Sequence, residues 1–551
     1  MALIAPPNKT PRLCDAVELT LAHYRKSHRE GPEASTAPIP PKRSAKCRQR
    51  FNIGIDAIAH APRSTILIHH PRIRWMAGGG LNVGGGRRDR FAVQGSALLG
   101  GFMARTAHIL LAERDEETAA GRQAAFDKEG YDVKVTTDPD MVAEAVRVQQ
   151  PDIVLLGRFK GEGTLEILEA LKADDDTSSI PVMLIGMRSD EALRNRAVEL
   201  RAADILERDR SSNEMILTRL QSVRRLAAMR SELFRRAETC AEFGIEADLS
   251  QVGVYDHAET AHLLMVSESS EYQADLYDAL LGKGLDAIIE QAPYRAANRL
   301  DDQDFDAVVI TATLYDDREK VLYLSSHIRN NTRLFNMPML VVKDEDTDPP
   351  EMNLYRGGAN IVLPHNKDYG ALTTYTLLMV DRRRLWNSVT EPFRTLMTDK
   401  IIDADLGSVH SATFFEAHLK REVKHALERD SHLSVAVVSI PTAVRIEKDY
   451  GRENAELLLS RIANWLSGMV KASDAVGRLG AYQFGIIMPA TPEKEANQVA
   501  FRIAGILQNS EFALGEEVME AIHVLVDCGV STIQPYDTPK KMLTRARQAI
   551  G

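Results

Sequence analysis

The chain has little cysteine and no long apolar run. Its 551 residues include four cysteines, Cys14, Cys47, Cys240 and Cys528, which are too far apart in the sequence to form a CxxC pair. This pattern indicates neither a disulfide framework nor a zinc site, and it is typical of a reducing compartment. No run of about 18 apolar residues occurs, and the N-terminus lacks the basic and then apolar pattern of a signal peptide. We therefore expect a cytoplasmic chain without a membrane span and without a metal or other cofactor.

The net charge of −10 is unevenly distributed along the chain. Residues 1–102 carry 16 Lys and Arg against 6 Asp and Glu, whereas the remainder carries 52 against 72. Residues 103–551 are therefore too acidic to be a good candidate for nucleic-acid binding, which depends on cations that neutralise phosphates. Residues 1–102 also combine proline-rich pieces, a basic cluster and two glycine triplets, with no apolar period. We expect a disordered or mis-annotated N-terminal extension there, with a functional basic arm as the alternative.

The rest of the chain is long enough for three folding units. Short apolar strands first alternate with amphipathic helices, and the expected strands are 108–112, 131–135, 152–156, 181–185 and 203–206. The same order then repeats, with strands at 262–266, 286–290, 306–310, 338–342 and 360–363. Five continuous apolar strands separated by helices predict a parallel, doubly wound sheet. The repetition predicts two tandem copies of it, at 105–230 and 258–385.

The last part of the chain has a different pattern. After an expected linker helix at 386–402, helices alternate with a strand at 434–440, a hairpin-like segment at 475–489 and a strand at 522–533. Helices packed on a mostly antiparallel sheet fit this order. We therefore predict an α+β unit over 403–551.

The repeated unit resembles the response-regulator receiver domain. The first copy carries the resemblance in "ILLAERDEE", "PDIVLLG", "IPVMLIG" and "RAADILERD". In that family carboxylates hold Mg²⁺, an Asp at the end of the third strand accepts phosphate, and a hydroxyl residue and a Lys bind the phosphoryl group. The matching positions here hold Glu113 and Arg114 (acidic pair), Gly157 (acceptor), Gly186 (hydroxyl) and Arg208 (lysine). Glycine has no nucleophile, so the resemblance implies no phosphoacceptor in this copy.

The second copy departs from the family by different substitutions. Ser267 and Glu268 stand at the acidic pair, Thr311 at the acceptor, Lys343 at the hydroxyl position and His365 at the lysine position. We predict that neither copy forms an aspartyl phosphate and that both act as packing and dimerisation modules. Phosphorylation of Thr311 or His365 is the alternative.

Residues 403–551 resemble the GGDEF (diguanylate cyclase) family. The match runs through "FFEAHLKREV", "LSVAVVSI", "DYG", "SDAVGRLGAYQFGIIMPAT", "QVAFRIAGIL" and "LVDCGVST". Two receivers followed by such a domain make up the PleD-type architecture. The resemblance implies an α/β chain with two tandem doubly wound receiver-like domains, followed by an α+β domain of the nucleotide-cyclase type.

The catalytic positions of that family are replaced. A cyclase joins two GTP molecules with the help of divalent metal, which the family holds through an Asp after the first core strand and an acidic residue of the signature hairpin. Ser439 stands at the metal Asp position. The signature is replaced by Gly480, Ala481, Tyr482, Gln483 and Phe484, of which only the first and last match. A phenol and an amide bring no negative charge to a metal, so we predict no catalytic residue and no metal site.

The nucleotide-reading positions are also altered. Glu447 replaces an Asn that donates to guanine, whereas Glu456 replaces an Asp and can still accept. The family's product-binding RxxD site is here "KASD", with Lys471 in place of Arg, Asp474 retained, and Arg502 on the following helix. Lys offers a point charge where Arg offers a two-pronged fork to guanine. A cyclic-di-GMP site formed by Lys471, Asp474 and Arg502 is one interpretation, and an ordinary surface ion pair is the other.

Together these features predict a noncatalytic scaffold or adaptor of bacterial cyclic-di-GMP and cell-cycle signalling. It is similar to the PopA-like members of the PleD type, and the resemblance implies protein partners, a homodimer and a cytoplasmic, polar location. The first alternative is an effector that binds cyclic-di-GMP through the modified RxxD site. The second is an active diguanylate cyclase.

Overall fold

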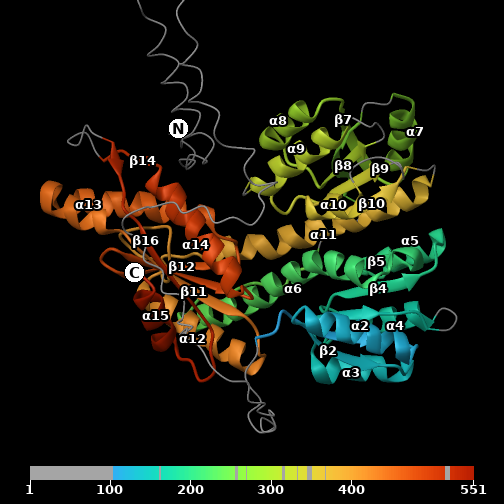
Figure 1. Cartoon of the computed structure of the whole chain (residues 1–551), viewed down its shortest axis with the longest axis horizontal. Coiled ribbons are helices and arrows are strands. Elements are labelled where there is room, and N and C mark those ends of the chain that lie inside the picture. Colours follow the sequence, from blue (N-terminus) through green and yellow to red (C-terminus); the bar gives the residue numbers. More distant parts are fainter. Residues whose placement is uncertain are drawn as a thin grey trace, which may run out of the picture. The chain divides into compact units, whose positions relative to one another are not determined.

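Two five-stranded parallel sheets and one four-stranded antiparallel sheet form the core of the molecule (Figure 1). The computed structural model describes residues 104–550 except 160–162, 255–258, 268–269, 313–316, 332, 344–349, 366–367 and 515–520. These residues all belong to one unit, 74–551. The expected N-terminal extension, and Glu268 of the second receiver copy, lie outside the described residues.

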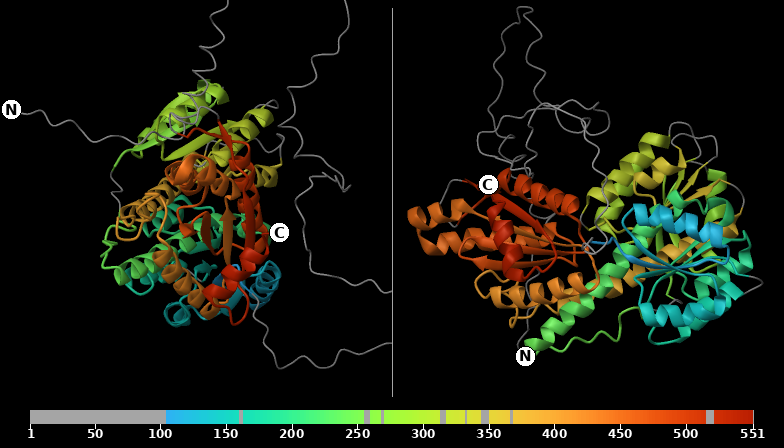
Figure 2. Two further views of the ribbon diagram at one scale, coloured as in Figure 1. Left: turned by 90° about the vertical axis from the view of Figure 1, so that its left-hand side faces the viewer. Right: turned by 60° about the horizontal axis from the view of Figure 1, so that its bottom comes forward.

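The first sheet has the strand order β2-β1-β3-β4-β5, with every pairing parallel. Its strands are β1 (His108–Ala112), β2 (Asp132–Thr136), β3 (Ile153–Leu156), β4 (Val182–Met187) and β5 (Asp204–Glu207). The helices are α2 (Glu116–Lys128), α3 (Val142–Gln149), α4 (Gly163–Ala173), α5 (Glu191–Glu199) and the long α6 (Asn213–Glu242). Along β1, Leu110 and Leu111 belong to apolar clusters on opposite faces. Helices cover both faces, which is why the strands are apolar at successive positions (Figure 2).

The second sheet repeats this connectivity as β10-β9-β8-β6-β7. Its strands are β6 (Ala261–Val266), β7 (Leu285–Glu290), β8 (Ala307–Ala312), β9 (Met339–Lys343) and β10 (Ile361–Pro364). Its helices are α7 (Ser270–Leu281), α8 (Pro293–Asp302), α9 (Asp317–Asn330), α10 (Glu351–Arg356) and α11 (Tyr369–Thr395). The order 2-1-3-4-5 in both copies is a common doubly wound order, so the predicted fold class of the repeated unit is confirmed.

The connection to the third domain differs from the prediction. The expected linker helix at 386–402 is not a separate element, because α11 runs without a break from Tyr369 through Pro392 to Thr395. The first receiver-like unit also ends later than 230, since α6 continues to Glu242. Side chains of α6 and α11, among them Leu233 and Phe393, meet in one apolar cluster that also contains Phe414 of the third domain.

The third domain is an antiparallel sheet of order β12-β13-β11-β16 with helices packed on it. Its strands are β11 (Leu433–Ser439), β12 (Ala475–Gly480), β13 (Gln483–Pro489) and β16 (Asp527–Thr532). The helices are α12 (Ala412–Glu428), α13 (Pro441–Met469), α14 (Glu493–Gln508) and α15 (Pro539–Gln548), and β14 (Glu511–Phe512) pairs with β15 (Ile522–His523). The strand expected at 522–533 is thus divided into β15 and β16. The predicted α+β fold is confirmed.

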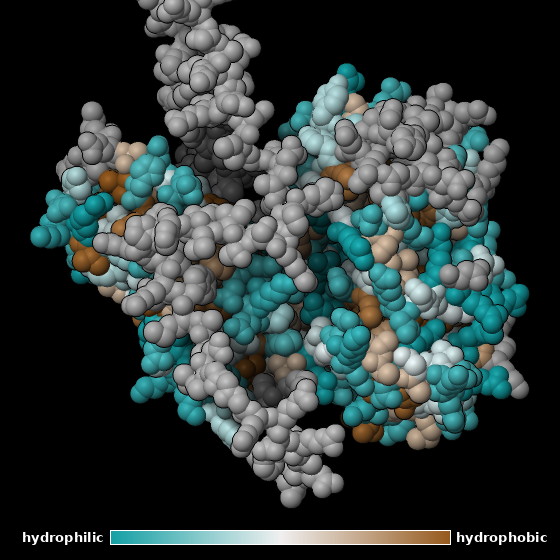
Figure 3. Space-filling view, viewed as in Figure 1, coloured by the Kyte–Doolittle hydropathy of each residue, from teal (hydrophilic) through white to brown (hydrophobic). Residues whose placement is uncertain are grey.

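Two features of the described part depend on its apolar residues: the capacity of its helices to span a membrane, and the patches on one face of its surface (Figure 3). None of the described helices is long and apolar enough to cross a membrane. On the face shown in Figure 3, hydrophobic residues of the described part form small, separate groups in a mostly hydrophilic surface. Scattered apolar residues of this kind are normal for a folded domain.

Candidate functional sites

At the end of β3, where a receiver has its phosphoacceptor, a carboxylate from the neighbouring strand fills the space. A Cβ atom on Gly157 would lie 2.7 Å from Glu113 Oε2 and 2.9 Å from the carbonyl oxygen of Ala112. Arg122 of α2 donates a hydrogen bond of 2.5 Å to Glu113 Oε2, and this ion pair is largely buried. The first receiver-like domain therefore lacks both the nucleophile and the room for it.

The remaining receiver positions of this domain have structural partners or face solvent. Arg114 and Arg208 are exposed. Gly186 has a φ of +72°, and its N–H donates to Ser211 Oγ at 2.8 Å.

In the second receiver-like domain the acceptor position is buried. The Thr311 hydroxyl donates to the carbonyl oxygen of Val266 at 3.4 Å, and Ser267 and Lys343 are buried beside the same strand ends. The backbone N–H of His365 donates to the Lys343 carbonyl oxygen at 2.7 Å. A buried hydroxyl that donates to the backbone is poorly placed to receive a phosphoryl group, so the geometry favours a structural role for Thr311.

In the third domain the metal position lies at the end of β11. Ser439 pairs with Gln483 on β13 and with Asp527 on β16. The turn between β12 and β13 carries Ala481 and Tyr482, and Gly480 and Phe484 flank it as the resemblance implies. The serine hydroxyl and the glutamine amide are neutral, so neither supplies the charge that a divalent ion requires.

The two replaced substrate positions bind each other. The Tyr482 hydroxyl donates a hydrogen bond to Glu447 Oε2, and the Tyr482 ring packs against the apolar cluster of the domain. The N–H of Ile440 donates to the Tyr482 carbonyl oxygen at 3.0 Å, which holds the turn against the end of β11. The side chain at the hairpin therefore contacts Glu447, which stands where the resemblance places a guanine-reading residue.

The second guanine-reading position is engaged as well. Arg478 Nη2 donates to both Glu456 carboxylate oxygens, at 2.9 and 3.1 Å, and Nη1 donates to Asp403 and Asp405 at 3.3 Å each. The Arg478 side chain is only 14% exposed. Burial alone would lower the pKa of Arg478, but Glu456 and Asp403 raise it above its usual value. Glu456 is thus already neutralised by a protein cation.

The three predicted cyclic-di-GMP residues lie in or beside one loop, 469–474. Asp474 is 6% exposed, and its Oδ2 accepts the Lys471 N–H at 3.0 Å, while the Lys471 side chain is exposed. The exposed Arg502 donates to the Met469 carbonyl oxygen at 2.8 Å. Within the described part of the chain, Asp474 Oδ1 has no hydrogen-bond partner, and burial raises the pKa of Asp474 to about 6.

A cation from α6 holds this loop. Arg236 donates to the carbonyl oxygens of Ser473, at 2.9 Å, and Ala472, at 3.4 Å. Its guanidinium also lies 4.6 Å from the centre of the Phe393 ring on α11. Sequence reasoning missed this contact, because Arg236 is more than two hundred positions away from the loop.

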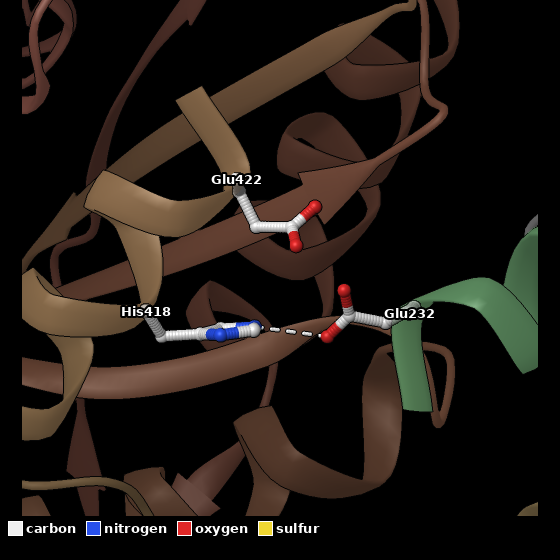
Figure 4. Close-up of side chains that lie close together, drawn as sticks. All are labelled: Glu232, His418 and Glu422. Carbon is white, nitrogen blue, oxygen red and sulfur yellow. Dashed lines mark hydrogen bonds and ion pairs between the residues drawn. The ribbon is translucent and has the colours of Figure 1, made fainter. Parts of the chain in front are cut away.

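A buried polar cluster lies next to Arg236 (Figure 4). It is formed by Glu232 on α6 with His418 and Glu422 on α12. His418 Nε2 lies 2.9 Å from Glu232 Oε1. Arg236 Nη2 donates to the same oxygen at 2.8 Å, and Arg235 Nη2 donates to Glu422 Oε2 at 3.1 Å and to Glu232 Oε2 at 3.2 Å. The cluster joins two helices that are far apart in the sequence, and its signal in the sequence is the i, i+4 spacing of His418 and Glu422 on an amphipathic helix.

The cluster has the spacing of a metal site but not its charge. One ligand atom from each of Glu232, His418 and Glu422 lies within 4.8 Å of the others. However, the guanidinium groups of Arg235 and Arg236 already bind the two carboxylates, and a divalent ion would be repelled by two buried cations. The pKa of His418 is lowered, chiefly by burial, which favours the neutral ring. Burial and then the charge of Glu232 raise the pKa of Glu422 to about 8, which favours its neutral carboxylic acid. The residues fit a buried hydrogen-bonded network that joins α6 to α12 better than they fit a metal centre.

The chain is similar to several known proteins. Residues 403–551 match the family model "Diguanylate cyclase, GGDEF domain". The response regulator PleD of Caulobacter vibrioides is 26% identical over 458 residues, which cover 81% of this chain and 96% of PleD. Diguanylate cyclase TpbB of Pseudomonas aeruginosa is 24% identical over 131 residues, or 24% of this chain and 30% of TpbB. The solved GGDEF domain of DgcB from Caulobacter crescentus, in complex with c-di-GMP, has 16% identity and a TM-score of 0.27, and the match covers 28% of this chain and 86% of that one.

Proposed function

We propose that this chain, a homologue of the response regulator PleD that carries a GGDEF domain, is a noncatalytic scaffold or adaptor in cyclic-di-GMP signalling. The observation that carries the proposal is the hydrogen bond between Tyr482 and Glu447. It joins the two side chains that stand where the cyclase family binds metal and guanine. The site is therefore satisfied internally rather than open to substrate.

Binding GTP at this position would require several favourable contacts to break. The nucleotide would have to displace Tyr482 from Glu447 and Arg478 from Glu456, and it would find only Ser439 where the metal carboxylate belongs. Charge-assisted hydrogen bonds contribute about 1.5–3 kcal/mol each, and a buried polar group left unpaired adds a further penalty. The absence of a metal carboxylate removes the charge stabilisation on which phosphoryl chemistry depends.

The receiver-like domains support a scaffold rather than a phosphorylation-driven output. Gly157 has no nucleophile and its surroundings leave no room for one, and Thr311 is buried. We include in the proposal protein partners, homodimerisation through these domains and recruitment to a cell pole, all of which the resemblance to PopA-like proteins implies.

The direct test of the proposal is product formation from GTP. The full chain with Mg²⁺ or Mn²⁺ should give no more cyclic-di-GMP than a mock preparation, measured by chromatography with mass detection. A matched preparation of an active GGDEF protein controls for the assay. Turnover above the mock level that depends on protein concentration would contradict a noncatalytic role.

A second candidate function, a cyclic-di-GMP effector, is favoured by one observation, the unpartnered Oδ1 of Asp474. We expect no saturable binding in a calorimetric titration, because the carboxylate is buried and Lys471 cannot offer the bidentate contact of Arg. Lys471→Arg tests whether the substitution alone prevents binding, and Asp474→Asn is the matched control. Saturable binding by the unmodified chain that Asp474→Asn abolishes would establish the effector function instead.

A further inference from the structure

A pocket rich in arginine lies where α6 and α11 meet the second receiver-like domain. It measures about 410 Å³, including space open to solvent, and its lining includes Ser222, Arg225, Arg329, Asn336, Arg382 and Trp386. Several lining residues of the second receiver-like domain, among them Pro338 and Asn360, come just before β9 and β10, at the amino ends of these strands. The pocket is therefore separate from the acceptor position Thr311, which is near the carboxyl end of β8.

Among the described residues, the hydrogen bonds of the Arg329 guanidinium all go to neutral groups. Its Nε and Nη2 donate to the Gly358 carbonyl oxygen at 3.1 and 2.5 Å, and Nη2 also donates to Asn360 Oδ1 at 3.0 Å. Its Nη1 donates to the carbonyl oxygens of Phe335 and Met337 at 2.9 and 2.8 Å. Burial, followed by the charge of Arg225, lowers the pKa of Arg329 to about 10. The guanidinium is fixed in place, and its positive charge is not cancelled.

Arg382 adds a second fixed cation to the pocket. It donates to Ser222 Oγ at 3.0 Å and to the Ala203 carbonyl oxygen at 2.7 Å. Asp204 lies 3.6 Å from it, but that carboxylate is already bound by Arg219. Burial and then the charge of Arg219 lower the pKa of Arg382, while Asp204 opposes the shift.

Arg225 is held less firmly than the other two arginines. Within the described part of the chain its guanidinium forms no hydrogen bond, and it lies 5.6 Å from the centre of the Phe335 ring. Part of the Arg225 side chain is exposed at the mouth of the pocket, while its guanidinium packs among neighbouring groups. The pKa of Arg225 is lowered by burial of the charged group, by Arg224 and by Arg382, with Glu495 acting in the opposite direction. Its hydrogen-bond donors are therefore available in a region of positive potential.

We propose that this pocket binds one phosphate-sized oxyanion, either free or as the terminal group of a phosphomonoester. Arg225 would supply the charge-assisted hydrogen bonds, the fixed charges of Arg329 and Arg382 would supply the field, and the Asn336 amide is a further donor at the lining. An anion there would replace the mutual repulsion of three cations with attraction. The ligand would connect α6, α11 and the second receiver-like domain, independently of the sites that the cyclase and receiver families use.

The test is a titration of the full chain with inorganic phosphate at constant ionic strength. Binding is monitored by the fluorescence of Trp386, which lines the pocket. We expect a saturable change that Trp386→Phe removes. Arg225→Gln should weaken binding by about tenfold or more, the size expected for losing a charged hydrogen bond. Arg394→Gln, which removes an exposed arginine from the same helix as Trp386, is the matched control and should change the affinity by less than about twofold.

A second arm uses adenosine monophosphate in place of phosphate, and sulfate as a competitor. Binding of phosphate supports a free oxyanion as ligand, and binding of the nucleotide alone supports a phosphomonoester. Circular dichroism melting checks that Arg225→Gln remains folded. The proposal is overturned if neither ligand gives a saturable change, or if Arg225→Gln and Arg394→Gln weaken binding equally.

Discussion

Replacing Glu232 by alanine should lower the free energy of unfolding by about 3–5 kcal/mol, the usual cost of removing one partner from a buried ion pair. Glu232 is fully buried and accepts hydrogen bonds from Arg235, Arg236 and His418. Without its carboxylate, Arg236 has no acidic partner in the cluster and faces only the carbonyl oxygens of the 471–474 loop and the Phe393 ring. A buried guanidinium left in that state is costly.

Urea denaturation, followed by circular dichroism and tryptophan fluorescence, measures this effect. Glu391→Ala is the control, because it breaks an exposed pair with Arg394 and should change stability by less than about 1 kcal/mol. The double variant Glu232→Ala, Arg236→Met should recover part of the loss if the uncompensated charge is its cause. An effect of Glu232→Ala no larger than that of the control would show that the cluster does not stabilise the α6–α12 junction.

The same cluster should make the protein sensitive to acid. Burial alone would raise the pKa of Glu232, but His418, Arg236 and Arg235 together hold it well below its ordinary value of 4.5. Because the folded-state pKa is lower than the unfolded one, the stabilisation is present above about pH 4.5 and is lost as the pH falls through the folded-state value. Glu232→Gln should flatten the stability profile over this acidic range.

The elements were predictable where local pattern and burial agree. The strand over 108–112 has the boundaries expected from the sequence, and the helix α12 (Ala412–Glu428) is one of the helices expected in the third unit. In the strand, consecutive apolar residues are buried on both faces of a parallel sheet. The helix has an N-cap at Ser411, whose side chain accepts from the Phe414 N–H. The linker helix was misjudged because the last helix of the second receiver-like unit continues into it, so that the expected boundary at 385 lies inside α11.

The candidate sites were predictable only as positions, not as contacts. The resemblance identified Tyr482 and Glu447 as replacements, but their hydrogen bond links residues 35 positions apart and depends on how the hairpin packs. The sequence left open whether Asp474 faces a nucleotide or forms a surface ion pair, whereas it is buried in a loop that Arg236 of α6 holds. Such contacts arise from tertiary packing, which a pattern in one segment does not contain.

A second prediction concerns the GTP turnover of variants in which the cyclase site is rebuilt. The triple variant Ala481→Gly, Tyr482→Asp, Gln483→Glu restores the signature hairpin, but we expect its GTP turnover to remain at background. Tyr482→Asp removes the hydroxyl that donates to Glu447 and sets a carboxylate beside it, so the two negative charges repel each other. Ser439 still leaves the metal without its other carboxylate.

Adding Ser439→Asp and Glu447→Asn addresses both defects together. The first substitution places a carboxylate at the end of β11, beside Gln483, the position that the triple variant makes Glu. The second removes the repulsion and restores an amide that can donate to guanine. Correct placement of the metal accounts for much of the rate enhancement in such reactions. Product should therefore rise only in the variant that carries all five substitutions. Cyclic-di-GMP from GTP is measured by chromatography against a mock preparation of each variant. Turnover by the hairpin variant alone would mean that the Tyr482 substitution, rather than the combined loss of metal and base contacts, is what silences the domain.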